Sequence, residues 1–146
     1  MTMNERPVSW RYFLVAGLVL STIAPCVGAA ETAEDLAQKA AESWLKLVDT
    51  RKFDESWTQA ASLFKRAITK AQWAQAADGA VKPLGKLVSR QLKARQFAEK
   101  LPMAPDGKYV VIQYDSVFEN KSAAVETVTP MLDADGVWRV SGYFIK

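Results

Sequence analysis

Four strand-like segments separated by turn-forming residues occupy the second half of this chain. The segments cover approximately 87–97, 109–118, 123–132 and 137–145. The separators are 102–107, Asn120-Lys121 and Asp135-Gly136. Asp-Gly between alternating apolar and polar residues is one of the strongest short-range signals of a β-hairpin. The pattern therefore predicts a four-stranded antiparallel sheet.

The last two turns each imply a strand register, and the two registers can be compared. The turn at 120–121 places Ser116 opposite Val125, and the turn at 135–136 places Thr129 opposite Gly142. Both registers gather apolar side chains on one face, whereas a one-residue slip would move a strand's side chains to the other face. The predicted inner face holds Val110, Ile112, Tyr114, Phe118, Val125, Met131, Trp138, Val140 and Phe144.

Helical periodicity occupies the residues before the strands. Apolar residues recur every three or four positions after Thr32, again over 53–65, and in a short segment that opens at Thr69 and stops at Gly79. Thr32 with Asp35, and Thr69 with Gln72, have the spacing of capping boxes. The fold class predicted is α+β, with three N-terminal helices packed on a four-stranded, curved, cone-like antiparallel sheet. Trp44, Trp57 and Trp73 are the bulky residues expected between the layers.

The first thirty residues have the pattern of a secretory signal peptide. Arg6 and Arg11 precede a mostly apolar run, Tyr12–Ile23, which is shorter than the roughly 20 residues that span a bilayer. Small residues follow and predict cleavage near Ala29 or Ala30. We therefore expect a signal peptide over 1–30 and a single domain over 31–146. The mature protein is expected to be periplasmic or secreted and to meet the membrane only during export.

Two residue types that support much of enzyme chemistry are missing from the predicted mature chain. Histidine is absent, and Cys26 is the single cysteine. Pro25 precedes Cys26 and argues against a lipid-modified cysteine, and cleavage after Ala30 would remove it. The mature chain therefore has no Ser-His-Asp or Cys-His nucleophile system and no His/Cys zinc site. We expect no cofactor and no metal, and the nearly balanced charge argues against a nucleic-acid partner.

Five segments carry a family resemblance that runs over nearly all of the predicted mature chain. They are AESWLKLVD at 41–49, FDESW at 53–57, PLGKLVSR at 83–90, APDGKY at 104–109 and VWRVSGY at 137–143. In these segments and their order the chain resembles the bacterial domain-of-unknown-function family 4019. The resemblance implies a small exported bacterial protein and supplies no activity or site residues. Arg51 and Met103 stand where this family leads us to expect glycine. More loosely, the architecture is similar to the nuclear-transport-factor-two-like cone fold, which hosts enzymes, binders and dimerisation modules.

The predicted interior offers polar groups that suit binding better than catalysis. The candidate ligand-binding residues are Arg90, Tyr114, Ser116, Thr127 and Thr129. No carboxylate is predicted among them, so the interior lacks the base that proton transfer requires. An interior lined by hydroxyls and apolar groups suits a small apolar or amphiphilic ligand. The alternative is a closed core whose hydroxyls are satisfied internally.

Two other functions remain open on the sequence. Asp115 and Glu126 are predicted to lie opposite each other on the outer face, where paired carboxylates can do acid/base work. A cone-fold enzyme would use Tyr114 with Asp115 or Glu126 as acid and base. Six cations lie between 82 and 100 and would suit an anionic envelope surface, or would keep an edge strand from pairing. These cations are Lys82, Lys86, Arg90, Lys93, Arg95 and Lys100.

The function predicted is a non-catalytic binding or interaction module of the bacterial cell envelope. The outer face of the sheet is apolar enough to predict a homodimer interface. Its apolar residues are expected to be Val111, Val117, Val128, Leu132, Tyr143 and Ile145.

Overall fold

The computed structural model describes residues 29–146, and the predicted signal peptide lies almost wholly outside the described residues. The helices are α1 (Ala33–Asp49), α2 (Phe53–Gln59), α3 (Ser62–Ala67) and α4 (Lys70–Val81), followed by the short 3-10 helix η1 (Lys82–Leu84). The strands are β1 (Leu87–Ala98), β2 (Tyr109–Phe118), β3 (Lys121–Leu132) and β4 (Trp138–Ile145). None of the helices described is long and apolar enough to cross a membrane.

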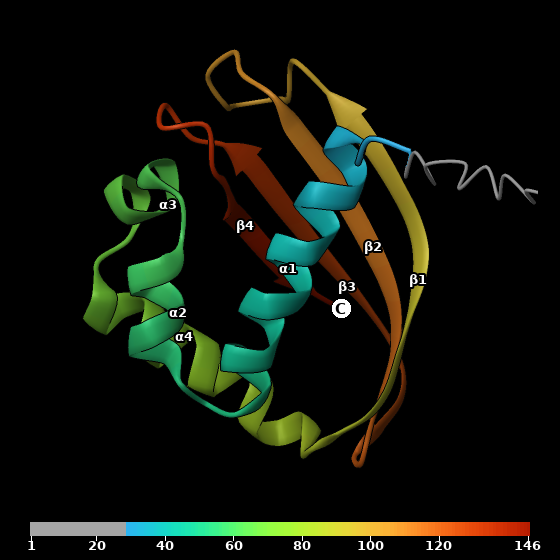
Figure 1. Cartoon of the computed structure of the whole chain (residues 1–146). Coiled ribbons are helices and arrows are strands. Elements are labelled where there is room, and N and C mark those ends of the chain that lie inside the picture. Colours follow the sequence, from blue (N-terminus) through green and yellow to red (C-terminus); the bar gives the residue numbers. More distant parts are fainter. Residues whose placement is uncertain (1–28) are drawn as a thin grey trace, which may run out of the picture.

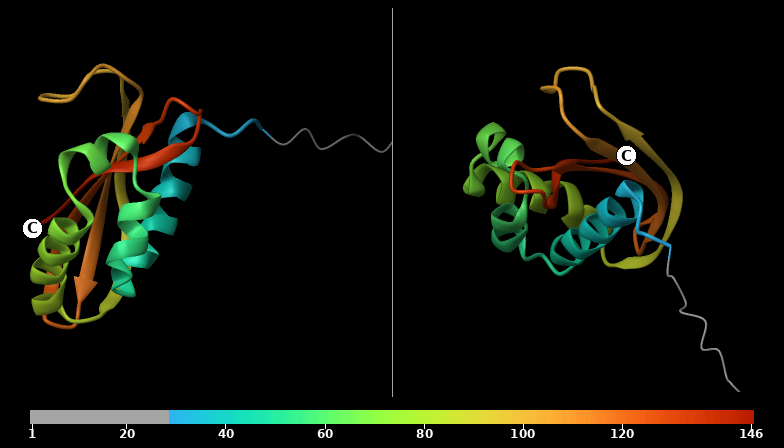
Figure 2. Two further views of the ribbon diagram at one scale, coloured as in Figure 1. Left: turned by 90° about the vertical axis from the view of Figure 1, so that its left-hand side faces the viewer. Right: turned by 45° about the horizontal axis from the view of Figure 1, so that its top comes forward.

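The helices cover one face of a curved antiparallel sheet whose strand order is β1-β2-β3-β4 (Figure 1). Turning the molecule shows that no helix of residues 29–146 covers the sheet's other face (Figure 2). The predicted α+β class and four-stranded antiparallel sheet are thus confirmed.

The helix starts follow the local signals, but one predicted helix is divided in two. Both predicted capping boxes are present, at Thr32 and at Thr69. Between α2 and α3, Ala60 and Ala61 are extended and completely buried, and the Ala61 N–H donates to the Val140 carbonyl at 2.8 Å. This bond to β4 cannot form within a continuous helix, so the predicted 53–65 helix becomes α2 and α3.

The predicted register between β2 and β3 was wrong by one residue. Tyr114 pairs with Glu126, and the turn residues are Glu119 and Asn120 rather than Asn120-Lys121. The turn is held against the segment before β1, because the Glu119 N–H donates to the Lys86 carbonyl at 2.9 Å. Moving the turn by one residue shifts the pairing by two residues, and a bulge in β3 between Lys121 and Ala124 takes one residue back, so the net slip is one residue. The slip exchanges the two faces of β3.

The register between β3 and β4 was predicted correctly over Thr127 and Thr129, which pair with Phe144 and Gly142. Because β3 is turned over, both threonines face outward, and Phe144 is 59% exposed. Val125 and Met131, predicted to face inward, share their outer face. The predicted dimer face needs the same correction, since its four residues on β3 and β4 lie on the inner face. These are Val128, Leu132, Tyr143 and Ile145.

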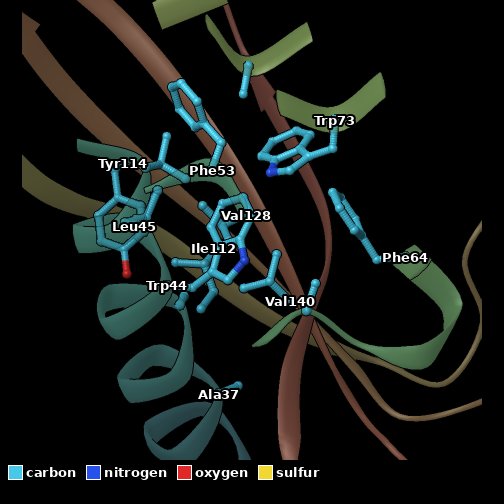
Figure 3. Packing of buried hydrophobic residues seen from close by; sticks show 14 of the residues in the cluster. Ala37, Trp44, Leu45, Phe53, Phe64, Trp73, Ile112, Tyr114, Val128 and Val140 are labelled. Atoms are coloured by element: carbon cyan, nitrogen blue, oxygen red, sulfur yellow. The ribbon is translucent and has the colours of Figure 1, made fainter. Parts of the chain in front are cut away.

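The core between helices and sheet is built around aromatic rings (Figure 3). Trp44 and Trp73 lie with ring centroids 5.5 Å apart, and Phe64 meets the Trp73 ring edge-on at 5.0 Å. Ser56 joins the two tryptophans, because its carbonyl accepts from Trp44 Nε1 at 2.8 Å and its Oγ accepts from Trp73 Nε1 at 2.9 Å. The core therefore fixes α1, α2 and α4 relative to one another.

The two positions where the family resemblance favours glycine both have left-handed backbone. Arg51 has φ of 58° and Met103 has φ of 62°. After α1 the Arg51 N–H donates to the Val48 carbonyl and the Lys52 N–H to the Leu47 carbonyl, which is a Schellman motif. Its left-handed position is usually glycine because a side chain there is strained. The left-handed backbone at Arg51 and Met103 thus explains why the resemblance leads us to expect glycine at these positions.

Replacing Arg51 or Met103 with glycine is expected to raise the free energy of unfolding by about 0.5–1 kcal/mol per site. The strain relieved exceeds the entropy that glycine adds to the unfolded chain. Arg51→Ala and Met103→Ala are the controls, because they shorten the side chain but keep the strained Cβ. Urea denaturation of all four variants measures the effect. Equal stabilities of the glycine and alanine variants would contradict the assignment of strain.

Candidate functional site

Glu126 is a completely buried carboxylate on the inner face of the sheet, where no acidic residue was expected. Both of its oxygens are occupied. Arg90 donates from Nε at 2.6 Å and from Nη2 at 3.0 Å, Ser116 Oγ donates at 2.5 Å, and Tyr143 Oη donates at 2.8 Å. Four donors fill the acceptor capacity of a carboxylate. The predicted placement of Glu126 on the outer face was wrong, because the register slip turned it inward.

Arg90 of β1 links this carboxylate to the end of α1. Its Nη1 and Nη2 donate to the two carboxylate oxygens of Asp49 at 2.8 and 2.9 Å. Burial by itself lowers the pKa of Arg90, but its hydrogen bonds and the charges of Asp49 and Glu126 outweigh burial and raise it above the ordinary value. The guanidinium therefore stays charged and is shared by two carboxylates.

Tyr143 is held in its protonated form by Glu126, to which its hydroxyl donates a hydrogen bond. Burial, and then the negative charge of Glu126 and the hydrogen bond donated to it, raise the pKa of Tyr143 above its ordinary value. Its ring packs on Trp44 with centroids 5.5 Å apart. The charged cluster, which consists of Asp49, Arg90, Ser116, Glu126 and Tyr143, is therefore in direct contact with the aromatic core.

A cleft of about 310 Å³ lies between α1 and β1, and Arg90 is one of the residues that line it. Four residues of α1, one turn apart or less, form one wall: Glu42, Leu45, Lys46 and Asp49. Leu87, Arg90 and Leu92 of β1 form the other wall, with Tyr114 of β2. Leu92 faces inward but is 44% exposed. This volume is at the lower end of the range for ligand pockets.

Tyr114 brings an unsatisfied polar group to this cleft. Its side chain is 3% exposed, and its hydroxyl has no hydrogen-bond partner within residues 29–146. Burial, and then the charge of Glu42, raise the pKa of Tyr114 to about 12, so the hydroxyl is protonated at neutral pH. Tyr114 lies next to Leu45 at the margin of the buried cluster (Figure 3). A buried hydroxyl without a partner costs about 1–3 kcal/mol and calls for an explanation.

The structure brings together three of the five candidate residues predicted from sequence. Arg90, Tyr114 and Ser116 lie on the inner face, although Ser116 is committed to Glu126. Thr127 and Thr129 lie on the outer face, and their predicted placement in the interior was wrong. Sequence reasoning missed Asp49, Glu126 and Tyr143 as members of the charged cluster. The alternation Ala124, Glu126, Val128, Pro130 contained the missing signal, since it describes an inward-facing row once a one-residue bulge is placed at the start of β3.

The other charged groups singled out from sequence are mostly engaged in ion pairs at the surface. Asp115 lies on the outer face and accepts from Lys93 Nζ at 2.9 Å. Arg95 pairs with Asp35 at 2.7 Å, and Lys100 lies near a carboxylate of its own loop. Four of the six cations between 82 and 100 thus have acidic partners, counting Arg90. Among residues 29–146 there is no group of three or more His, Cys, Asp or Glu side chains that could hold a metal ion.

Comparison with protein families matches residues 40–143 to the model described as "Protein of unknown function (DUF4019)". The chain belongs to this family. A search of curated proteins gave no match. The DUF4019 match extends from α1 to β4 and includes Asp49, Arg90, Tyr114, Glu126 and Tyr143. The charged cluster and the cleft therefore lie within the DUF4019 domain itself, while the looser similarity to the cone fold stays a prediction.

Proposed function

We propose that this chain is a non-catalytic binding module of the bacterial cell envelope, and that its binding site is the cleft between α1 and β1. The observation that carries the proposal is the Tyr114 hydroxyl, which is buried at the cleft without a partner in the described chain. Native proteins satisfy nearly all buried polar groups. A ligand in the cleft would satisfy this one.

Four of the eight residues that line the cleft are charged, but most of its lining surface is apolar, as in a small-molecule site. Leu45, Leu87 and Leu92 provide apolar surface, and Tyr114 provides a convergent polar group. Such sites combine mostly apolar lining with a few placed hydrogen-bonding groups. The exposure of Leu92 in an inward-facing position gives a ligand apolar surface to cover.

The carboxylates argue for binding rather than catalysis. A general base needs an acceptor position within reach of the substrate. Glu126 has four donors on its two oxygens, and Asp115 is on the opposite face of the sheet beside Lys93. These contacts do not support the enzyme alternative that pairs Tyr114 with Asp115 or Glu126. Glu42, the carboxylate near Tyr114 in the cleft wall, lies on the exposed side of α1.

The envelope location rests on the basic, apolar and small-residue segments of the first thirty residues. The expected result is a periplasmic or secreted protein whose first residue is Ala30 or Glu31. Cell fractionation with N-terminal sequencing of the protein would measure this. An intact N-terminus in the cytoplasmic fraction would contradict it.

The binding site can be tested by leucine-methyl NMR with 1-octanol as the probe. Shifts are expected at Leu45, Leu87 and Leu92 and not at Leu63, which is outside the cleft. Leu92→Trp is designed to fill the cleft and abolish the shifts, and its partial exposure makes the substitution tolerable. Val88→Trp is the matched control on the same strand, since Val88 is exposed and does not line the cleft. Shifts that survive Leu92→Trp, or that occur elsewhere, would contradict the proposed site.

A further inference from the structure

The cleft contains a buried cation, yet its charges are arranged against an anionic ligand. Arg90 directs its guanidinium at Asp49 and Glu126, with four N–H···O distances between 2.6 and 3.0 Å. Lys46 and Glu42 add one charge of each sign at the α1 wall. The two carboxylates that line the cleft, Glu42 and Asp49, balance its two cations. Glu126, which does not line the cleft, also pairs with Arg90. An anion entering the cleft would meet a guanidinium that two carboxylates already neutralise.

The hydrogen-bonding capacity of Tyr114 further limits the chemical class of the ligand. A protonated hydroxyl can donate one hydrogen bond and accept others. A carboxylate ligand could accept from Tyr114 but could not donate to it, and an ammonium ligand could donate but not accept. A hydroxyl group on the ligand can both donate to Tyr114 and accept from it. It is also uncharged, and burying an uncharged polar group costs less free energy than removing a charged group from water.

We propose that the cleft binds a small, uncharged apolar molecule through a single hydroxyl group that pairs with Tyr114. This inference rests on the proposed function and names the ligand class for the same site. The apolar part of the molecule would lie against Leu45, Leu87 and Leu92. Arg90 contributes by staying engaged with its two carboxylates, so it holds α1, β1 and β3 in place and does not act as an anion receptor.

Three probes that share one alkyl chain test this ligand class: 1-octanol, octanoate and octylammonium. Their dissociation constants are measured from leucine-methyl shifts on the whole mature chain at neutral pH. The expected result is that 1-octanol binds at least tenfold more tightly than either charged probe. Tyr114→Phe is expected to weaken 1-octanol about tenfold and to change the charged probes little. This variant should fold, because the hydroxyl it removes has no partner in the described chain.

The possible failures are distinguishable. Octanoate or octylammonium binding in the cleft as tightly as 1-octanol would overturn the ligand class and leave the binding site standing. Unchanged binding of 1-octanol to Tyr114→Phe would overturn the role of the hydroxyl. No cleft shift with any probe up to its solubility limit would overturn the proposed function together with this inference.

Discussion

Replacing Arg90 with methionine is expected to lower the free energy of unfolding by about 3–5 kcal/mol. The substitution keeps much of the side-chain volume but removes the charge that compensates Glu126. Glu126 is completely buried, and its remaining donors would be the hydroxyls of Ser116 and Tyr143. Urea denaturation of the wild type and the variant measures the loss.

A double-mutant cycle separates the ion pair from the packing around it. Arg90→Met with Glu126→Leu removes both charges, and this double variant is expected to be more stable than Arg90→Met alone. Lys93→Met is the matched control on β1, because its ion pair with Asp115 is exposed and is expected to contribute less than about 1 kcal/mol. A loss for Arg90→Met as small as that for Lys93→Met would contradict the buried position of Glu126.

Replacing Trp44 with alanine is expected to lower the free energy of unfolding by about 3–5 kcal/mol. Trp44 is 3% exposed, and its ring contacts the rings of Phe64, Trp73 and Tyr143. The substitution would leave a cavity between α1 and β4, and it would leave the Ser56 carbonyl without the indole donor. Urea unfolding followed by circular dichroism measures this loss.

Two further variants separate the causes of this effect. Trp44→Phe keeps most of the ring volume but removes the hydrogen bond to Ser56, so about 1–3 kcal/mol is expected. Leu36→Ala on the same helix is the control, since Leu36 is 41% exposed and a loss below about 1 kcal/mol is expected. If Trp44→Ala cost no more than Leu36→Ala, the aromatic core described would be contradicted.

Local signals predicted most of the elements, because they depend on residues close in sequence. Thr32 with Asp35, and Thr69 with Gln72, form both halves of a capping box within three residues. Asp135-Gly136 sets a hairpin in the same way, and Gly136 has φ of 79°. These features needed no knowledge of the rest of the fold.

The site could not be predicted because it depends on contacts between distant segments. The turn after β2 begins at Glu119, where the backbone is bound to Lys86, 33 residues earlier. The β-bulge that follows this turn, at the start of β3, leaves the pairing one residue from the predicted register and takes Glu126 from the predicted outer face to the centre of the charged cluster. Ala61 shows the same limit, since its bond to Val140 divides a helix that periodicity predicts to be continuous. Tyr114 and Arg90 were placed correctly because they face inward in either register.

In this account the Tyr114 hydroxyl binds a ligand and does not stabilise the fold. The most direct test of this central claim is urea denaturation of Tyr114→Phe with and without 1-octanol. Without 1-octanol the variant is expected to be as stable as the wild type or more stable by up to about 1 kcal/mol, because a buried hydroxyl without a partner is removed. With 1-octanol the wild type is expected to gain more stability than the variant. A variant less stable than the wild type without 1-octanol, or an equal gain in both, would contradict this account.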